Sequence, residues 1–193
     1  MIATLTQEEQ DKILEVAQTH SIRVYAMVHT LVQTGLRVSE LSGLVIDDVY
    51  IAGQIKRVLV LRCEIAKNST RREIPISSSL QKTLIGYLVW VEKHHKGLDI
   101  GWPLFSQLDH NAPLSSRQIE RCVRAVGGAA LGRRIWPHML RHTFATNLLR
   151  VSNTAIVQQL LGHKNLSSTQ VYVHPSADDK AEAIARMALN GKT

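Results

Sequence analysis

Six residues of this chain could act together on a phosphate ester. They are Arg37, Lys67, His138, Arg141, His163 and Tyr172. The planar guanidinium group of arginine forms paired, charge-assisted hydrogen bonds with phosphate oxygens and does not lose its charge. Histidine can donate to an oxygen or move a proton, lysine can protonate a departing sugar oxygen, and tyrosine can be a covalent nucleophile where cations stabilise its phenolate. Such a set suits phosphoryl transfer at a DNA phosphodiester and requires no metal.

Taken singly, the first four of these residues also have ordinary structural explanations. Arg37 could form a surface pair with Glu40 one turn further on, and Lys67 could be a solvated lysine at a hairpin tip. His138 and Arg141 are three residues apart, which places both on one side of a helix, where they could be solvated. Each of the four positions therefore indicates chemistry only as part of the larger set.

The last two positions have ordinary explanations as well. His163 follows Gly162 directly and could cap the carbonyl groups at a helix end. Tyr172 could be a packed ring whose hydroxyl group has a hydrogen-bond partner. The six together match the needs of a pentacoordinate phosphorus, which must have donors on its non-bridging oxygens. The combination favours phosphoryl transfer over six unrelated structural roles.

The elements that must position these residues begin with helices. The stretch "LTQEEQDKILEVAQTH" starts with Thr6 and Glu9 in the pattern of a capping box, which predicts a first helix. A second helix is predicted in "SIRVYAMVHTLVQTG" and ends at Gly35, a natural C-terminal stop. A short helix in "RVSELSGL" follows, so Arg37 stands between two helices.

The pattern changes to a β-hairpin in "QIKRVLVLRCEIAKNSTRREIPI". Leu59, Leu61, Cys63 and Ile65 alternate with other residues, as in a half-buried strand. The turn is expected in residues 67–70, and the return strand in residues 71–76. The hairpin would carry Lys67 at its turn.

The rest of the chain is predicted to be helical. "SSSLQKTLIGYLVWVEKHHKG" forms a long helix, and "SSRQIERCVRAVGGAALG" starts at Ser115 and stops in its glycines. "WPHMLRHTFATNLLRVS" has Pro137 in its first turn, and "NTAIVQQLLGH" stops at Gly162. Two more helices are expected near residues 166–173 and 178–189. The predicted fold class is mainly α with one small antiparallel β-sheet, the hairpin.

Composition sets limits on the class of protein. The chain has 193 residues, of which 45% are hydrophobic, and it contains no repeat or Gly/Ser linker, so one compact domain is expected. It has no uncharged apolar run of about 18 residues and no signal-peptide pattern at its start, which predicts a cytoplasmic protein with no membrane partner. Cys63 and Cys122 lack disulfide or zinc spacing and are expected in the core.

The charge of the chain points to a polyanionic partner. The formal net charge is +7, which suits nucleic acid through contacts with phosphates. Arg117, Arg121 and Arg124 lie near the start of a predicted helix and are candidate DNA contacts. A basic face that is only solvated would look the same.

Four stretches of the chain resemble those of the tyrosine recombinases, or phage-type integrases, and most closely their Xer-like branch. The stretches are "TGLRVSEL", "AKNSTRREIPI", "PHMLRHTFAT" and "LLGHKNLSSTQVYVH", and they run in the family's order from residue 34 to residue 174. The resemblance implies six catalytic residues: Arg37, Lys67, His138, Arg141, His163 and the nucleophile Tyr172.

The resemblance also implies a fold, a function and partners. It implies the tyrosine recombinase catalytic-domain fold and a site-specific DNA recombinase that works through a covalent 3′-phosphotyrosyl intermediate without a cofactor. Its partner would be double-stranded DNA with specific recombination sites, bound by a homotetramer that could be a monomer when free. Residues 1–193 would be a single catalytic domain, with the family's N-terminal core-binding domain absent from this chain. A fragment of a longer recombinase and a short stand-alone member, like the fimbrial switch invertases, both fit.

Three other interpretations fit part of the pattern. A type IB topoisomerase uses the same kind of chemistry on one duplex, and relaxation of supercoiled plasmid without site preference would support it. A DNA-binding regulator could keep the fold without catalysis, although the complete set of six argues against it. A metal-dependent nuclease fits less well, because the nine histidines are scattered and the adjacent His94 and His95 point to different sides of a helix.

Overall fold

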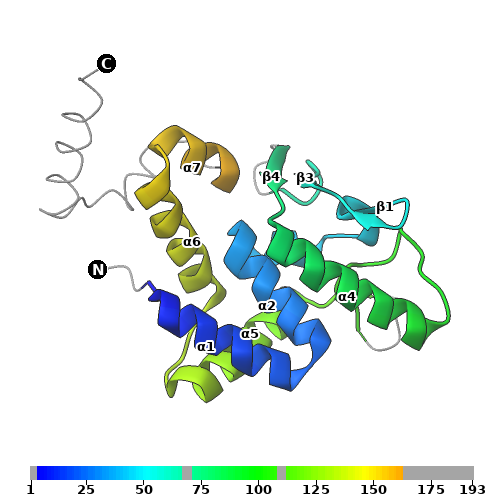
Figure 1. Ribbon diagram of the computed structural model, residues 1–193, viewed down its shortest axis with the longest axis horizontal. Coiled ribbons are helices and arrows are strands. Elements are labelled where there is room, and N and C mark those ends of the chain that lie inside the picture. The colour runs from blue at the N-terminus through cyan, green and yellow to red at the C-terminus, as the bar shows by residue number, and fades with distance from the viewer. Residues whose placement is uncertain (1–3, 67–70, 108–111, 163–193) are drawn as a thin grey trace, which may run out of the picture.

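The computed structural model describes residues 4–66, 71–107 and 112–162. This part of the chain is mainly helical with two antiparallel two-stranded sheets, which confirms the predicted class (Figure 1). The helices are α1 (Gln7–His20), α2 (Ile22–Thr34), α3 (Val38–Ser42), α4 (Ser78–His95), α5 (Ser116–Leu131), α6 (Pro137–Val151) and α7 (Thr154–Leu161), with the short 3-10 helix η1 (Ile46–Asp48). The strands are β1 (Tyr50–Ile51), β2 (Gln54–Ile55), β3 (Val58–Leu61) and β4 (Arg72–Pro75).

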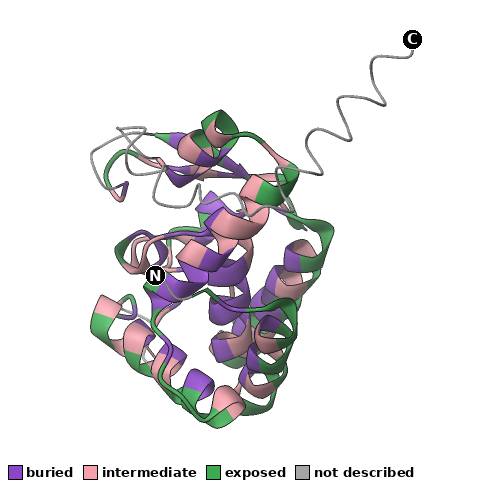
Figure 2. Ribbon diagram, turned by 90° about the vertical axis from the view of Figure 1, so that its left-hand side faces the viewer, coloured by how far each residue is buried: buried purple, intermediate pink, exposed green. Residues whose placement is uncertain are grey.

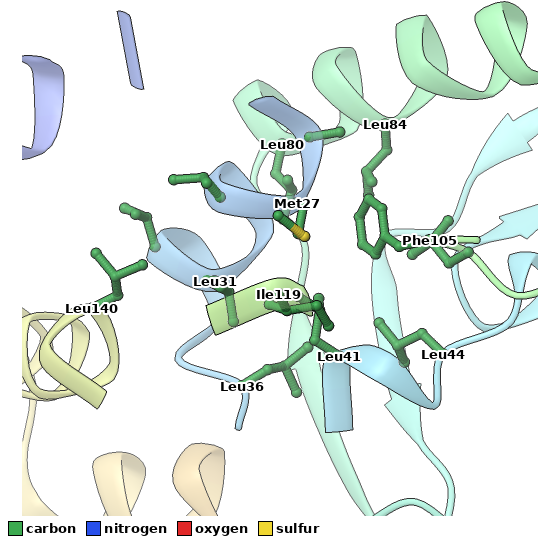
Figure 3. Close-up of a cluster of buried hydrophobic side chains, with 14 of the residues drawn as sticks. Met27, Leu31, Leu36, Leu41, Leu44, Leu80, Leu84, Phe105, Ile119 and Leu140 are labelled. Atoms are coloured by element: carbon green, nitrogen blue, oxygen red, sulfur yellow. The ribbon is translucent and has the colours of Figure 1, made fainter. Parts of the chain in front are cut away.

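Helix α2 lies at the centre of the helical body. It packs against α1, α4 and α6, and most of its residues are buried (Figures 1 and 2). Met27 and Leu31 of α2 share the interior with Leu84 of α4, Ile119 of α5 and Leu140 of α6 (Figure 3). Burial of these apolar side chains is the main force that holds the helices together. It fixes α6, which carries His138 and Arg141, beside the end of α2 that precedes Arg37.

The predicted helix starts are confirmed by their caps. The Thr6 hydroxyl accepts from the Glu9 backbone N–H at 3.2 Å, while the Glu9 carboxylate accepts from the Thr6 N–H at 3.0 Å. Ser115 and Gln118 form a second capping box at the start of α5, and Pro137 is the first residue of α6. Such caps satisfy backbone groups that a helix end would otherwise leave unbonded.

Helix α5 ends at the last glycine of the predicted stretch. The helix does not stop in its glycine pair but passes through Gly127 and Gly128 and ends at Gly132. A Cβ atom on Gly127 would lie 2.1 Å from Cγ1 of Ile135. The glycine at that position therefore serves close packing inside the helix rather than termination.

The predicted hairpin is present, but its first strand is shorter than expected. Strands β3 and β4 pair antiparallel, with Leu59 opposite Ile74. After Leu61 the chain turns, because the backbone N–H groups of Ile65 and Ala66 both donate to the Arg62 carbonyl, at 3.3 and 3.0 Å. The predicted turn in residues 67–70 and the helices near 166–173 and 178–189 lie outside the described residues.

The early turn corrects the prediction for one cysteine. Cys63 lies in the turn and is exposed, so its expected place in the core is wrong, whereas Cys122 is half-buried and packs against the core. Arg62 anchors the chain here, with Nε 2.8 Å and Nη2 3.0 Å from the two Asp48 carboxylate oxygens. The ion pair between Arg62 and Asp48 thus fixes the chain directly after the end of β3.

A second, very short hairpin was not predicted. Strands β1 and β2 pair with Tyr50 opposite Ile55, and the two residues between them, Ala52 and Gly53, both have positive φ, 46° and 83°. Two-residue hairpin turns favour such backbone conformations, but alanine is an unusual residue for the first position. Strands of two residues also give no alternation to detect.

No helix in the described ranges is both long and apolar enough to span a membrane. Even α4, which is the longest, carries charged and polar residues along its length. Its apolar residues Leu80, Leu84, Leu88 and Val91 are buried against the rest of the fold.

Candidate active site

Three of the six predicted site residues lie in the described part of the chain. Arg37, His138 and Arg141 are described, whereas Lys67, His163 and Tyr172 lie outside the described residues. The fold brings the two arginines to the same bend of the chain. Nη1 of Arg141 donates to the carbonyl oxygen of Gly35 at 2.5 Å, only two residues before Arg37.

The bend before Arg37 depends on Gly35. This residue ends α2 in a left-handed conformation with φ of 60°, which strains any residue with a Cβ atom. A Cβ atom there would also lie 2.4 Å from Cδ1 of Phe144. Helix α6 therefore packs directly against the bend. Both the positive φ and the close contact with Phe144 require glycine at position 35.

Replacing Gly35 with alanine should destabilise the protein by about 2–4 kcal/mol, the sum of backbone strain and overpacking. Urea unfolding followed by circular dichroism measures this loss. Gly132→Ala is the matched control, because Gly132 has φ of 65° but no atom within 4 Å of an added Cβ. An equal loss in both variants would contradict the proposed clash with Phe144.

Arg37 stands at the N-terminus of α3 and is held by Glu40. Its backbone N–H donates to Oε2 of Glu40 at 2.8 Å, and its Nη1 donates to Oε1 at 2.9 Å. The Arg37 side chain is mostly buried and the Glu40 side chain completely so. The structural pairing considered for Arg37 is thus present, and it fixes the direction of the guanidinium group.

Glu40 has a second arginine partner that the sequence prediction missed. Nη1 and Nη2 of Arg72, in β4, donate to Oε1 and Oε2 of Glu40 at 3.0 and 2.7 Å. Burial alone would raise the pKa of Glu40, but the hydrogen bonds and charge of Arg72, followed by those of Arg37, lower it from 4.5 to about 2. The Glu40 carboxylate is therefore ionised at any physiological pH.

Arg72 could have been found from the strand pattern. Residues of β4 alternate, so that Arg72 and Ile74 face the interior while Glu73 faces solvent. A charged residue at an inward position of a strand implies a buried partner of opposite charge. The alternation that predicts the strand therefore also marks the arginine on its inner side.

The C-terminal end of α7 is bound by two arginines. Nε of Arg72 donates to the Leu160 carbonyl oxygen at 2.9 Å, and Nη2 of Arg141 donates to that of Leu161 at 2.8 Å. These carbonyls lack partners within the helix and carry its negative partial charge, so cations are favoured there. Arg37, Glu40, Arg72 and Arg141 together form what we call the arginine network, which joins α2, α3, β4, α6 and α7.

Two histidines of α6 lie next to this network. His138, in the first turn, is exposed, and its ring centre is 6.5 Å from that of His142. Burial, and then the charges of His138 and Arg141, lower the pKa of His142. The His142 ring is thus neutral at pH 7. Across the described segments, no three His, Cys, Asp or Glu side chains are grouped so that they could hold a metal ion.

A basic groove lies along the start of α5. It has a volume of about 310 Å³ and is lined by Ser115, Arg117, Gln118, Arg121 and Arg124. The guanidinium carbon of Arg124 is 5.3 Å from the ring centre of Trp136, the residue just before α6. The three predicted DNA-contacting arginines therefore line one hollow, and it lies next to the helix that carries His138 and Arg141.

Comparison with known proteins identifies relatives along most of the chain. The model of the family described as "Phage integrase family" matches residues 3–179. Tyrosine recombinase XerA of Pyrococcus furiosus is 36% identical over 189 residues, which are 96% of this chain and 62% of the relative. Tyrosine recombinase XerC of Halalkalibacterium halodurans is also 36% identical, over 90% of this chain and 58% of the relative. The chain thus spans about three fifths of the length of these relatives.

Solved structures show the same fold. A crystal structure of XerA recombinase matches with a TM-score of 0.78 at 29% identity, covering 97% of this chain and 64% of that one. XerH site-specific recombinase, solved bound to its difH substrate, matches with a TM-score of 0.74 at 23% identity, over 94% of this chain and 53% of that one. The predicted catalytic-domain fold is confirmed.

Proposed function

This chain belongs to the phage integrase family, and from that premise we propose that it is a site-specific DNA recombinase that cleaves and rejoins duplex DNA through a 3′-phosphotyrosyl intermediate. One observation carries the proposal at the level of geometry. In the arginine network, Arg37 binds Glu40 and Arg141 binds the Gly35 carbonyl, two residues before Arg37 in the chain. Two preorganised guanidinium groups at one place suit the charge that develops on a phosphate under attack.

In the proposed reaction, the phenolate oxygen of Tyr172 attacks the scissile phosphorus. A bond forms between that oxygen and phosphorus, the bond from phosphorus to the 5′ oxygen breaks, and Lys67 gives the departing oxygen its proton. Arg37 and Arg141 hold the non-bridging oxygens, and His163 adds a further hydrogen bond. A 5′-hydroxyl group of the partner strand then attacks the phosphotyrosine and gives its proton to the neutral Lys67; the new bond to phosphorus forms as the bond to the tyrosine oxygen breaks and Tyr172 leaves as phenolate.

His138 would assist this reaction from the first turn of α6. Its exposed ring can reach a substrate, and it can act as an acid or base or position Tyr172. The roles of Lys67, His163 and Tyr172 rest on the family's motifs, which these residues match. The chemistry draws only on these side chains.

The partner in this proposal is double-stranded DNA carrying specific recombination sites. We infer that complete exchange requires four protomers on two sites, so that the protein would act as a homotetramer on DNA. We also infer that residues 1–193 act as a single catalytic domain. On its own such a domain covers one side of the duplex, and its binding should be weak and should depend strongly on salt.

The groove on α5 is the proposed contact with DNA phosphates. Replacing Arg117 and Arg121 together with glutamine should reduce the slope of log affinity against log salt by about 1 for each phosphate that is no longer bound. Fluorescence anisotropy with a labelled duplex at several salt concentrations measures both affinity and slope. Lys93→Gln is the control, because it removes one positive charge from an exposed position on α4. Equal slopes for wild type and the double variant would contradict this contact.

A covalent capture experiment tests the proposed function. The 193-residue chain is incubated in EDTA with a pool of nicked duplexes whose arms are randomised, since a nick lets the cleaved strand diffuse away and traps the intermediate. A protein–DNA band that survives denaturation is expected, and sequencing of its DNA gives the preferred site. Tyr172→Phe should abolish the band. A band of unchanged intensity in that variant would overturn the nucleophile, and the absence of any band for wild type would count against the function.

A further inference from the structure

Arg72 connects three parts of the proposed active site. It lies in β4, the strand that begins five residues after Lys67 in the chain, and only 4% of its side chain is exposed. Its fork binds Glu40 of α3, and its Nε binds the end of α7. Resting on the function proposed above, we propose that Arg72 is a positioning residue of the strand-cleavage reaction, which sets the orientation of Arg37 relative to the end of α7.

The two arginines share the carboxylate of Glu40 completely. Oε1 accepts from Nη1 of Arg37 at 2.9 Å and from Nη1 of Arg72 at 3.0 Å. Oε2 accepts from the backbone N–H of Arg37 at 2.8 Å and from Nη2 of Arg72 at 2.7 Å. Because two parallel bonds from a planar fork fix the plane of a carboxylate, Arg72 decides where Glu40 presents its oxygens to Arg37. The bonds from Arg37 to Glu40 then fix the direction in which the Arg37 guanidinium group can meet DNA.

The third bond of Arg72 ties the same unit to α7. Nε donates to the Leu160 carbonyl, and a Cβ atom on Gly162 would lie 3.1 Å from Nη1 of Arg72, so glycine leaves the room that the guanidinium group occupies. His163 follows Gly162 directly in the chain. The last described residues before one proposed catalytic histidine are thus held by the same side chain that orients Arg37.

Lysine cannot replace this arrangement. The bonds of Arg72 leave from three different nitrogens, two toward Glu40 and one toward Leu160. A lysine has one nitrogen, which can bind Glu40 at a single point but cannot fix its plane and reach Leu160 as well. Arg72→Lys therefore keeps the charge and removes the alignment.

The same hairpin offers a matched control in Arg62. This residue also binds a carboxylate with two nitrogens, at 2.8 and 3.0 Å from Asp48, and donates to a backbone carbonyl, that of Gly43 at 3.1 Å. Those partners lie in η1 and just after α3, not in α7. Substitutions at Arg62, whose side chain is 39% exposed, thus disturb a similarly bonded but less buried ion pair without touching the link to Arg37.

The test uses the duplex that wild type captures in the experiment above. Arg72→Lys, Arg72→Gln, Arg62→Lys and Arg62→Gln are compared in melting temperature, in affinity for that duplex and in the rate of covalent attachment at saturating DNA. We expect Arg72→Lys to bind DNA within about threefold of wild type but to attach between about tenfold and a hundredfold more slowly, as for a small misplacement of a catalytic group. Arg62→Lys should attach at nearly the wild-type rate.

The pH profile of attachment separates positioning from simple loss of fold. Two charged groups act on Glu40, Arg72 from β4 and Arg37 from its own turn, and both lower its pKa while burial raises it. Without Arg72, the pKa of Glu40 should rise, and its protonation should release Arg37. The attachment rate of Arg72→Gln should therefore fall on acidification at a pH where wild type and Arg62→Gln are unaffected.

Each outcome decides the proposal. A wild-type attachment rate in Arg72→Lys would overturn it, and so would an equal slowing in Arg62→Lys or a wild-type pH profile of attachment in folded Arg72→Gln. If Arg72→Gln fails to fold, the lysine variant alone decides. Absence of attachment in wild type would instead count against the proposed function, so the two failures can be told apart.

Discussion

Replacing Arg141 with lysine should slow covalent attachment to DNA by about 10²- to 10³-fold, which corresponds to about 3–4 kcal/mol of transition-state stabilisation for one preorganised donor. The Arg141 side chain is buried in α6, where its guanidinium group binds the Gly35 and Leu161 carbonyl oxygens. In the proposed reaction it also binds a phosphate oxygen. Lysine keeps the positive charge but offers one nitrogen, so it cannot bind both carbonyls and the phosphate in fixed geometry. Single-turnover attachment at saturating DNA measures the effect.

The matched control for this prediction is Arg150→Lys. Arg150 is exposed in the last turn of the same helix, so the exchange should leave attachment within about twofold of wild type, as expected for a surface position. Unfolding of both variants must also be followed, because Arg141 supports the ends of α2 and α7. An attachment rate in folded Arg141→Lys within about threefold of wild type would remove Arg141 from the proposed phosphate clamp.

The helical framework was predictable because its signals are local. A capping box, a proline in a first turn or a glycine after an apolar stripe acts within four or five residues, and the structure confirms those at Thr6, Pro137, Gly35 and Gly162. Predictions were wrong where a distant contact decides. Strand β3, for example, ends early where Arg62 binds Asp48, which is 14 residues away in the chain.

In the site as well, local motifs were predictable from the sequence and distant contacts were not. The motif spacing predicts Arg37, His138 and Arg141 as site residues, and the fold brings Arg141 to the Gly35 carbonyl, two residues before Arg37. The motif spacing could not show that Glu40 binds two arginines, because Arg72 is 32 residues away from Glu40 in the chain. A residue that acts through another has no motif of its own. Only the three-dimensional structure shows that Glu40, which binds Arg37, also binds an arginine of β4 that is hydrogen-bonded to the end of α7.

Replacing Glu40 with glutamine should destabilise the protein by about 3–5 kcal/mol, the usual cost of removing one partner from a buried ion pair. Arg72 would keep its charge in a buried position, and Arg37 would lose an acceptor for both its side chain and its backbone N–H. Urea unfolding of the two proteins at pH 7 measures the difference. Glu73→Gln is the control. Glu73 follows Arg72 in β4, and its ion pair with Arg71 is exposed and should contribute less than about 1 kcal/mol to stability.

Acidification provides an independent check on the same carboxylate. Since the pKa of Glu40 falls from 4.5 to about 2 on folding, its ionised form contributes roughly 3 kcal/mol of stability above pH 4.5. That contribution should be lost progressively as the pH falls from 4.5 toward about 2, because the unfolded chain takes up the proton first. Other carboxylates titrate equally in wild type and Glu40→Gln, so the difference in unfolding free energy between the two isolates Glu40. This difference should narrow over that range, and a constant difference down to about pH 2.5 would mean that Glu40 is not the ionised centre of the arginine network.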